Sequence, residues 1–384
     1  MLPGGPPIGY AMGVPERVNL IADIPDRTVE RLMPLGLSLL GARRVISARV
    51  NRGEPDLGRV RDVPHARRAA IEEAAWLPEL RVIERRVDPA DGFAKYLLAL
   101  DDGLAVEAVR IPLMPGKDGK QRFTVCLSSE AGCGMGCGFC ATARMGFERR
   151  LEPWEIVAQM IAVRREAPGR VSGAVFMGMG EPFANFDAVL LASKILSHPI
   201  GLAIESLRIT LSTVGLVPQI RRFTELRRKE RLAVSLFSAV EETRRRWVPI
   251  ARKHDLVELR AALVEHCAAG GRPLVAITLV AGVNTSPEEA RAVAAFCRGL
   301  NVSIDLIDVN DSTGELRAPT AAERLAYIHE LRAAQRPIQV RYSGGQAIEA
   351  GCGMLAATRT GGRTALPVLG SLPHPRVGAG PLPL

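Results

Sequence analysis

The chain has 384 residues, of which 24% are charged and 47% hydrophobic, and its formal net charge is +9. This composition is typical of a globular protein with room for one large domain and a smaller one. No apolar stretch is long enough and free enough of charge to span a bilayer, and the first residues lack the basic segment and apolar core of a signal peptide. We therefore expect neither a membrane protein nor a secreted one.

The basic residues favour a polyanionic partner such as a nucleic acid. Most of them are arginines, whose guanidinium groups suit phosphate oxygens, and they occur in clusters. The clusters are Arg43-Arg44, Arg67-Arg68, Arg149-Arg150, Arg227-Arg228-Lys229 and Arg244-Arg245-Arg246. Solvated helix faces would explain the same pattern. Aromatic residues make up only 4% of the chain, so a broad platform for stacking bases is not indicated.

The first third of the chain divides into three segments. Residues 1–25 are rich in Pro and Gly and are expected to be a flexible N-terminus. Residues 26–80 are predicted to form a small helical accessory module, with helices separated by Pro and Gly at 27–40, 42–52 and 65–75. Residues 81–121 alternate polar and apolar positions between turn residues, which predicts a small antiparallel β extension.

From residue 122 to 358, short β-branched runs alternate with longer amphipathic stretches. The predicted strands are 123–127, 174–177, 207–211, 232–236, 274–280, 303–309 and 338–342, and the predicted helices are 153–166, 186–197, 217–229, 255–268, 286–299 and 319–334. Repeated βα units indicate a parallel sheet, and about six units predict a partial (β/α)6 barrel. Its chemistry should lie at the C-terminal ends of the strands. Residues 359–384 are predicted to be a disordered tail.

Three cysteines, Cys133, Cys137 and Cys140, follow the first predicted barrel strand in the run Cys-Gly-Met-Gly-Cys-Gly-Phe-Cys. Three thiolates on one loop can ligate three irons of a 4Fe–4S cube and leave the fourth iron open to another ligand. A zinc site would favour four closed ligands, and no fourth Cys or His lies within the next turn. A disulfide or three buried structural cysteines are the remaining alternatives. The spacing resembles the signature of the radical S-adenosylmethionine (SAM) superfamily, in which the open iron binds SAM.

A second motif reads Phe-Met-Gly-Met-Gly-Glu-Pro at residues 176–182 and ends another predicted strand. Glycine lets a ligand approach the backbone closely, and a carboxylate can receive the α-ammonium group of SAM. An ordinary βα turn with a capping glutamate would look the same. The run resembles the glycine-rich SAM motif of that superfamily, which assigns the binding role to Gly180 and Glu181.

Two further cysteines indicate which family within the superfamily the chain resembles. Cys126 ends the first barrel strand, and Cys352 lies near the end of the last βα region. Matching stretches are CLSSEAGCGMGCGFCATARMGFERRL, FMGMGEPFANFD, LSTVGLVP, LAVSLFSAVEETRRRWVPIARKH and AIEAGCGML. On these motifs, from about residue 30 to 358, the chain resembles the radical SAM RNA-adenine methyltransferases of the RlmN/Cfr type. Cys267 and Cys297 instead lie on apolar faces of predicted helices, which favours core packing.

The resemblance implies a reaction that uses two SAM molecules, because C2 and C8 of adenine are too electron-poor to attack a sulfonium methyl group. By match, Cys352 first accepts a methyl group, and a 5′-deoxyadenosyl radical formed at the single cluster then removes a hydrogen from it. The carbon radical adds to the base, and Cys126 releases the product through a transient Cys126–Cys352 disulfide. Thiol nucleophilicity and disulfide exchange suit both cysteines to these roles. Glu107 matches the proton acceptor, although strand alternation equally allows an outward-facing carboxylate.

The resemblance also assigns SAM contacts near the strand ends, at Ser212, Ser235, Leu236, Phe237 and Asn310. The chain departs from the family at several of these places. Phe237 stands where histidine is usual, the Ser-Thr-Ser-Gly run reads Ser-Thr-Val-Gly, the residues around Asn310 lack the usual prolines, and residues 341–351 lack the usual Arg-Gly-Asp type of pattern.

The resulting hypothesis is a cytoplasmic, monomeric methyltransferase that modifies C2 or C8 of an adenine in RNA, either 23S rRNA or tRNA. Flavodoxin or ferredoxin would supply electrons, and no membrane is involved. The helical module and arginine clusters would hold the RNA, whose target base must be unstacked. The diverged 341–351 segment motivates an alternative, methylation of a small molecule or peptide. A second alternative is a non-catalytic iron–sulfur protein that binds RNA or senses redox state.

Overall fold

The structure is a computed structural model that describes residues 17–311 and 313–356. The tail predicted at 359–384 and most of the predicted flexible N-terminus lie outside the described residues. Contacts divide the chain into two compact units. The smaller unit comprises Met1–Pro78 and His198–Ala203, and the larger comprises Glu79–Ser197 and Ile204–Leu384.

The smaller unit is mainly helical among its described residues. Its elements are β1 (Val18–Asn19), α1 (Pro25–Leu32), a 3₁₀ turn (Met33–Leu35), α2 (Leu39–Ile46), a π-helical turn (Ser47–Arg52), 3₁₀ turns at Leu57–Arg59 and His65–Arg67, α3 (Arg68–Ala74) and β2 (Ala75–Trp76). The single helix predicted at 27–40 is wrong. The chain turns at Gly36, whose φ is +88°, and Ser38 caps a new helix by accepting from the Gly41 amide at 3.0 Å.

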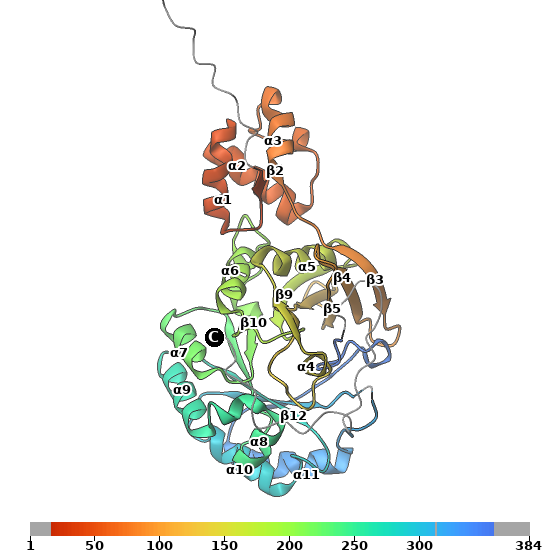
Figure 1. The fold of residues 1–384 in the computed structure, drawn as a ribbon, viewed down its shortest axis with the longest axis vertical. Helices are drawn as coiled ribbons and strands as arrows, with labels where there is room; N and C mark the ends of the chain where they lie inside the picture. Colours follow the sequence, from red (N-terminus) through yellow and green to blue (C-terminus); the bar gives the residue numbers. More distant parts are fainter. Residues whose placement is uncertain (1–16, 312, 357–384) are drawn as a thin grey trace, which may run out of the picture. The chain divides into compact units, whose positions relative to one another are not determined.

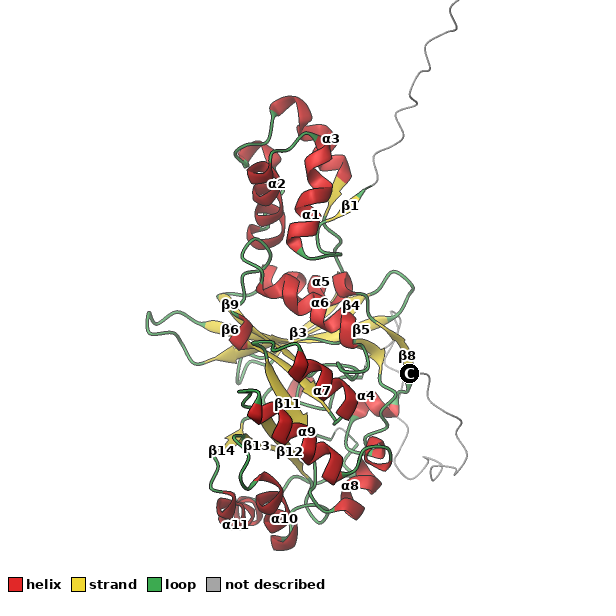
Figure 2. Cartoon of the chain, turned by 90° about the vertical axis from the view of Figure 1, so that its left-hand side faces the viewer, coloured by secondary structure: helices red, strands yellow, loops and turns green. Residues whose placement is uncertain are grey.

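The larger unit is built on one ten-stranded sheet, in the order β14-β13-β12-β11-β10-β9-β6-β5-β4-β3 (Figures 1 and 2). The antiparallel part comprises β3 (Arg81–Val87), β4 (Ala94–Ala99) and β5 (Ala105–Leu113). The parallel part comprises β6 (Arg122–Cys126), β9 (Arg170–Phe176), β10 (Ile209–Thr213), β11 (Arg231–Ser235), β12 (Leu274–Leu279), β13 (Ser303–Asp308) and β14 (Ile338–Arg341). Strand β5 joins the two parts by pairing antiparallel with β6.

Helices connect the parallel strands. They are α4 (Ala141–Arg144), α5 (Pro153–Arg165), α6 (Phe186–Ser197), α7 (Val217–Glu225), α8 (Glu241–Trp247), α9 (Leu256–Ala268), α10 (Pro287–Cys297) and α11 (Ala321–Leu331). Helices α7, α9, α10 and α11 follow one another around the outer side of the curved sheet (Figure 1). Side-chain caps begin several of them: Asp255 accepts from the Glu258 amide at 2.8 Å, and Thr320 forms a capping box with Glu323.

The predicted fold class is confirmed: the larger unit is a partial barrel of parallel strands and helices, in which β14 is a seventh parallel strand at the open edge, with a small antiparallel extension. Strands such as β12, whose residues Leu274–Leu279 are almost all buried, are near-continuous apolar runs because helices and side chains cover both faces. The sequence did not predict α8 or the short hairpin of β7 (Glu130–Gly132) and β8 (Phe147–Arg150). Both are too short for hydrophobic periodicity to reveal them.

Candidate active site

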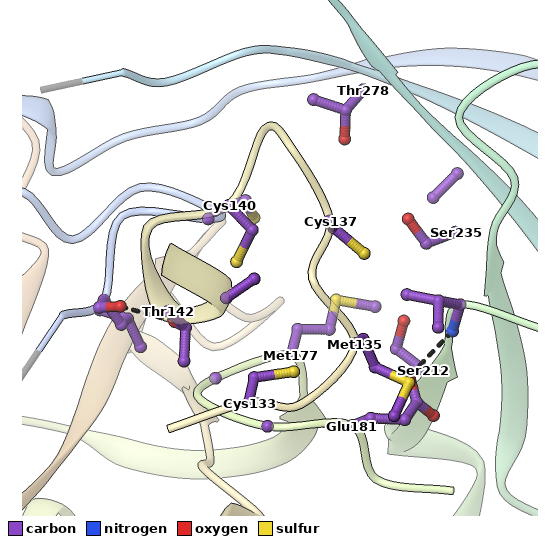
Figure 3. A pocket seen from close by; sticks show the side chains of 18 of the residues that line it. Cys133, Met135, Cys137, Cys140, Thr142, Met177, Glu181, Ser212, Ser235 and Thr278 are labelled. Atoms are coloured by element: carbon purple, nitrogen blue, oxygen red, sulfur yellow. Dashed lines mark hydrogen bonds between the residues drawn. The ribbon is translucent and has the colours of Figure 1, made fainter. Parts of the chain in front are cut away.

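The cysteine triplet lies on the loop that joins β7 to β8. At the base of this loop the Cys133 amide donates to the Gly146 carbonyl at 2.7 Å. Gly132 has a φ of +78°, and a Cβ there would lie 2.1 Å from the Gly146 oxygen, so only glycine fits. Cys133, Cys137 and Cys140 all line one cavity (Figure 3). The hairpin therefore holds three separate ligating groups around one cavity.

The cavity has a volume of about 150 Å³ and is lined by all three cysteines and by the ends of the barrel strands. Ser212, Ser235, Thr278, Ile307 and Arg341 come from five successive strands, β10 to β14. This is where a barrel of parallel strands places its chemistry. Gly180, Glu181 and Cys352 complete the set of predicted site residues on the wall.

The donor set fits a cluster better than a single metal ion. Burial raises the pKa of the Cys133 and Cys137 thiols well above their ordinary value, so they stay protonated until a metal displaces the protons. Within residues 17–311 and 313–356, no three His, Cys, Asp or Glu side chains are close enough together to hold one ion. Three thiols spread around a common cavity suit a larger iron–sulfur group.

Glu181 reaches the cavity from the turn after β9 and is 3% exposed. Its two carboxylate oxygens accept from the backbone amides of Phe183 and Val214, each at 2.9 Å. A carboxylate has about four acceptor positions, so it can still receive an ammonium group. The preceding Gly180 serves the protein's own packing, because a Cβ there would lie 2.5 Å from the Cβ of Glu130. The glycine is therefore required even without a ligand.

Two buried carboxyl groups share this corner of the site. Burial raises the pKa of Glu181 to about 7, although its hydrogen bonds from Val214 and Phe183 oppose the shift. Burial also raises the pKa of Glu130 to about 7, and Glu130 accepts from the Glu181 amide at 2.9 Å. An ammonium group binds the ionised carboxylate, so the predicted contact strengthens as pH rises toward 7.

We expect SAM affinity to rise with pH between about pH 6 and about pH 7.5, by at most tenfold per unit. Equilibrium dialysis of the cluster-loaded protein without a reductant measures it. Glu181→Gln should bind more weakly with a flatter profile, whereas Glu130→Gln should keep the slope. An unchanged slope in Glu181→Gln would exclude Glu181 as the titrating contact.

The two remaining candidate cysteines lie next to the cavity. Cys126 ends β6 and is 7% exposed, while Cys352 is exposed and lines the cavity wall. Neither cysteine forms a disulfide in the described residues. The charge of an ionised Cys352 raises the pKa of Cys126. Burial raises the pKa of Cys126 to about 12, and the Arg341 guanidinium opposes that rise. The structure thus places the cysteine triplet and Cys352 on one cavity, with Cys126 at the end of β6.

The chain is similar to known proteins in both sequence and structure. Residues 128–297 match the Radical SAM superfamily. The chain is 46% identical over 326 residues to a probable RNA methyltransferase of Anaeromyxobacter sp. (strain Fw109-5), covering 84% of this chain and 94% of that one. It is 36% identical to the dual-specificity RNA methyltransferase RlmN of Syntrophobacter fumaroxidans, covering 85% and 95%. A crystal structure of a radical SAM methyltransferase from Sphaerobacter thermophilus matches with a TM-score of 0.77 and 33% identity, covering 85% of this chain and 96% of that one.

The chain belongs to the RlmN-type radical SAM methyltransferases. It is therefore a SAM-dependent methyltransferase, and membership implies a 4Fe–4S cluster. No helix among the described residues is long and apolar enough to cross a membrane.

In this radical SAM methyltransferase, three predicted SAM contacts lie behind the cavity wall. Leu236 and Phe237 are fully buried, and the Phe237 ring stacks on Phe139 at 4.8 Å. The Asn310 amide group donates to the Ser343 hydroxyl at 2.6 Å and to the Cys352 carbonyl at 3.3 Å. Phe237 thus supports the cysteine loop, and Asn310 holds the segment that carries Cys352.

Glu107 does not face outward, so that alternative is wrong. It is 5% exposed on β5, its Oε1 lies 3.2 Å from the Lys95 ammonium, and its Oε2 accepts from the Ala356 amide at 2.9 Å. The antiparallel extension is buried on both faces here, which alternation along one strand cannot reveal. The prediction for Cys267 is also wrong, since it is partly exposed, whereas Cys297 is buried as expected.

Several clustered arginines are committed to the protein itself. Arg149 binds both Glu155 oxygens, at 2.8 and 2.7 Å, and Arg228 pairs with Glu230. Arg244 is fully buried, although its neighbours Arg245 and Arg246 are exposed. The arginine clusters in the sequence therefore suggest a more basic surface than the structure has.

Arg244 is the main site residue that the sequence did not reveal. Its guanidinium donates to the Val214 carbonyl at 2.6 Å, to the Ser235 carbonyl at 3.3 Å and to the Leu236 carbonyl. Burial lowers its pKa to about 10, and the nearby Cys137 opposes that shift. Its Nε has no hydrogen-bond partner among the described residues. One buried cation thus joins two strand ends of the cavity wall beside the cysteine loop, where an anionic cluster would be held.

Arg244→Met should lower the free energy of unfolding by about 3 kcal/mol, because three carbonyls lose a donor. It should also weaken SAM binding. Chemical denaturation and equilibrium dialysis measure the two effects. Arg245→Met, at an exposed pair with Glu241, should change stability by less than about 0.5 kcal/mol. Equal effects of both variants would contradict this account.

Proposed function

We propose that the chain methylates C2 or C8 of an adenine in RNA, through a methyl group first carried by Cys352. The observation that carries the proposal is the position of Cys352 on the wall of the cavity that the cysteine triplet also lines. A thiol there can accept a methyl group and present it to a radical formed in the same cavity. The relatives named RNA methyltransferases support RNA as the substrate.

The proposal assigns the cluster to Cys133, Cys137 and Cys140, and the SAM ammonium group to Glu181 beside Gly180. Bound together, cluster and SAM supply a 5′-deoxyadenosyl radical when one electron is added. Ser212 and Ser235, at the ends of neighbouring strands, are the polar wall groups available to the rest of SAM. Leu236, Phe237 and Asn310 are assigned to supporting this wall.

The protein's own groups then handle the substrate. The Cys352 thiolate attacks the methyl carbon of one SAM, S-adenosylhomocysteine leaves, and Cys352 becomes S-methylated. One hydrogen atom of the S-methyl group would pass to the 5′-deoxyadenosyl radical, and the resulting carbon radical would add to the base. The adduct would give up one electron, for which the oxidised cluster could be the acceptor, and Glu107 takes the proton from that base carbon. The Cys126 thiolate then attacks the Cys352 sulfur, which forms a disulfide and breaks the bond from sulfur to the methylene carbon, and that carbon takes a proton to become the product methyl group. The charge of Cys352 acts on the Cys126 thiol, which supports the pairing of these two cysteines in the exchange.

RNA would bind through cations that the protein does not use internally, and binding should weaken steeply with salt. We place the enzyme in the cytoplasm as a monomer, with 23S rRNA or tRNA as substrate and flavodoxin or ferredoxin as electron donor. A target base must leave its stack to reach the cavity, which favours a loop or a flipped nucleotide.

Nucleoside mass spectrometry of total RNA, with and without the gene, tests this proposal. We expect one methyladenosine isomer to disappear on deletion and to return when RNA from the deletion strain is treated with enzyme, SAM and reductant. An unchanged set of methyladenosines would contradict RNA as the substrate. If the reduced protein still cleaved SAM, the small-molecule or peptide alternative would then be favoured.

A further inference from the structure

A buried lysine lies behind the segment that carries Cys352. Lys95, on β4, is 5% exposed, and lysine is almost never buried without a partner. Its ammonium group lies 3.2 Å from Glu107 Oε1, donates to the Glu349 carbonyl at 3.1 Å and lies 3.9 Å from the Glu349 carboxylate. One cation therefore connects the β extension to a segment more than 250 residues later in the chain.

The Lys95–Glu107 pair holds this segment at two points. Lys95 binds the carbonyl of Glu349, and the other oxygen of Glu107 accepts from the amide of Ala356 at 2.9 Å. Cys352 lies between these two points. The buried ion pair thus reaches the chain on both sides of the thiol that accepts the methyl group in the proposed function.

The backbone supports the same conclusion. Glu349 has a φ of +53°, in the left-handed region that non-glycine residues seldom occupy. Such a conformation persists only where the surroundings hold it, and the Lys95 bond to the Glu349 carbonyl is one such restraint. Both partners of the ion pair come from adjacent positions of one rigid sheet, since β4 pairs with β5 and Leu97 lies opposite Glu107.

We propose that Lys95 is a positioning residue whose buried pair with Glu107 seats the segment 349–356, so that Cys352 stays within reach of SAM. The reactivity part of the proposal rests on the proposed function. The seating part concerns only the protein, and it can be tested without any reaction.

The test compares variants of the full-length, cluster-loaded protein. Lys95→Met alone leaves the Glu107 carboxylate buried without its cation and could fail to fold. We therefore pair Glu107→Gln with the double variant Lys95→Met/Glu107→Gln. The glutamine oxygen can still accept from the Ala356 amide in both, so the two proteins differ mainly in the Lys95 contact to Glu349. Lys95→Arg tests rescue by another cation, and Lys117→Met, at an exposed position, is the control.

Two measurements follow: amide hydrogen exchange in peptides covering 349–356, and SAM-dependent methylation of Cys352 by protein mass spectrometry. In the double variant we expect exchange to accelerate about tenfold or more and Cys352 methylation to fall by a similar factor, because a charge-assisted hydrogen bond is lost. Both changes are measured relative to Glu107→Gln, whereas Lys95→Arg and the control Lys117→Met should approach the wild type.

Equal exchange and equal methylation in the double variant and in Glu107→Gln would overturn the proposal. If the wild type never methylates Cys352 while the double variant still exchanges faster, the seating is upheld and the proposed function fails. The two failures are therefore distinguishable.

Discussion

Cys352→Ala should reduce methylation of RNA to less than about one thousandth of the wild-type rate. The variant lacks the sulfur that accepts the methyl group in the proposed function, whereas the cysteine triplet and Glu181 are unchanged. We expect iron content and SAM binding to stay near wild-type values and S-methylation of the protein to disappear. Nucleoside and protein mass spectrometry measure the two losses.

A matched control for this variant is Cys267→Ala. Cys267 is partly exposed on α9, and its thiol donates to the Asn301 carbonyl at 3.9 Å. The Cys267→Ala variant should methylate RNA at the wild-type rate. RNA methylation by Cys352→Ala at a comparable rate would show that no protein-bound methyl group is involved.

The second large effect concerns the cysteine loop. Cys137→Ala should lower iron from about four atoms per reconstituted chain to near zero and should abolish reductive cleavage of SAM. Cys137 is 5% exposed and packs against Phe237 and Val248, so its removal affects the interior of the site and not only its rim. Iron analysis and detection of 5′-deoxyadenosine after reduction measure the outcome.

Cys126→Ala is the control that distinguishes loss of a proposed cluster ligand from loss of a proposed reactive cysteine. It lies outside the loop and should retain iron and SAM cleavage, while a covalent protein–RNA adduct accumulates because no second sulfur releases it. Full iron occupancy in Cys137→Ala, or loss of iron in Cys126→Ala, would contradict the assignment of the triplet.

The sequence alone was sufficient to predict the barrel and to identify the candidate cysteines. The parallel strands are short buried apolar runs bounded by turns. The cysteine triplet is recognised from the spacing of its members within eight residues. These signals are local, so they can be read along the chain. The hairpin β7–β8 is local too, but each strand is only three or four residues long and lacks a recognisable period.

The rest of the site depends on contacts between distant segments. Arg244 stands in a run of three arginines, and only the packing of α8 against β10 and β11 shows that one is buried while the others are exposed. Glu107 looks like an alternating strand residue, and its burial depends on a partner on β4 and on the chain near Ala356. The resemblance assigned SAM contacts to Phe237 and Asn310, and the structure shows that the Phe237 ring stacks on Phe139 and that the Asn310 amide group holds Ser343 and Cys352.

The central claim is that the methyl carbon passes through Cys352 and loses one hydrogen there. The most direct test uses SAM with a trideuterated methyl group and unmodified RNA, followed by mass spectrometry of the methyladenosine. The account predicts a product methyl group with two deuterium atoms and a 5′-deoxyadenosine with one. A product that keeps all three deuterium atoms would show direct transfer of an intact methyl group and would contradict the account.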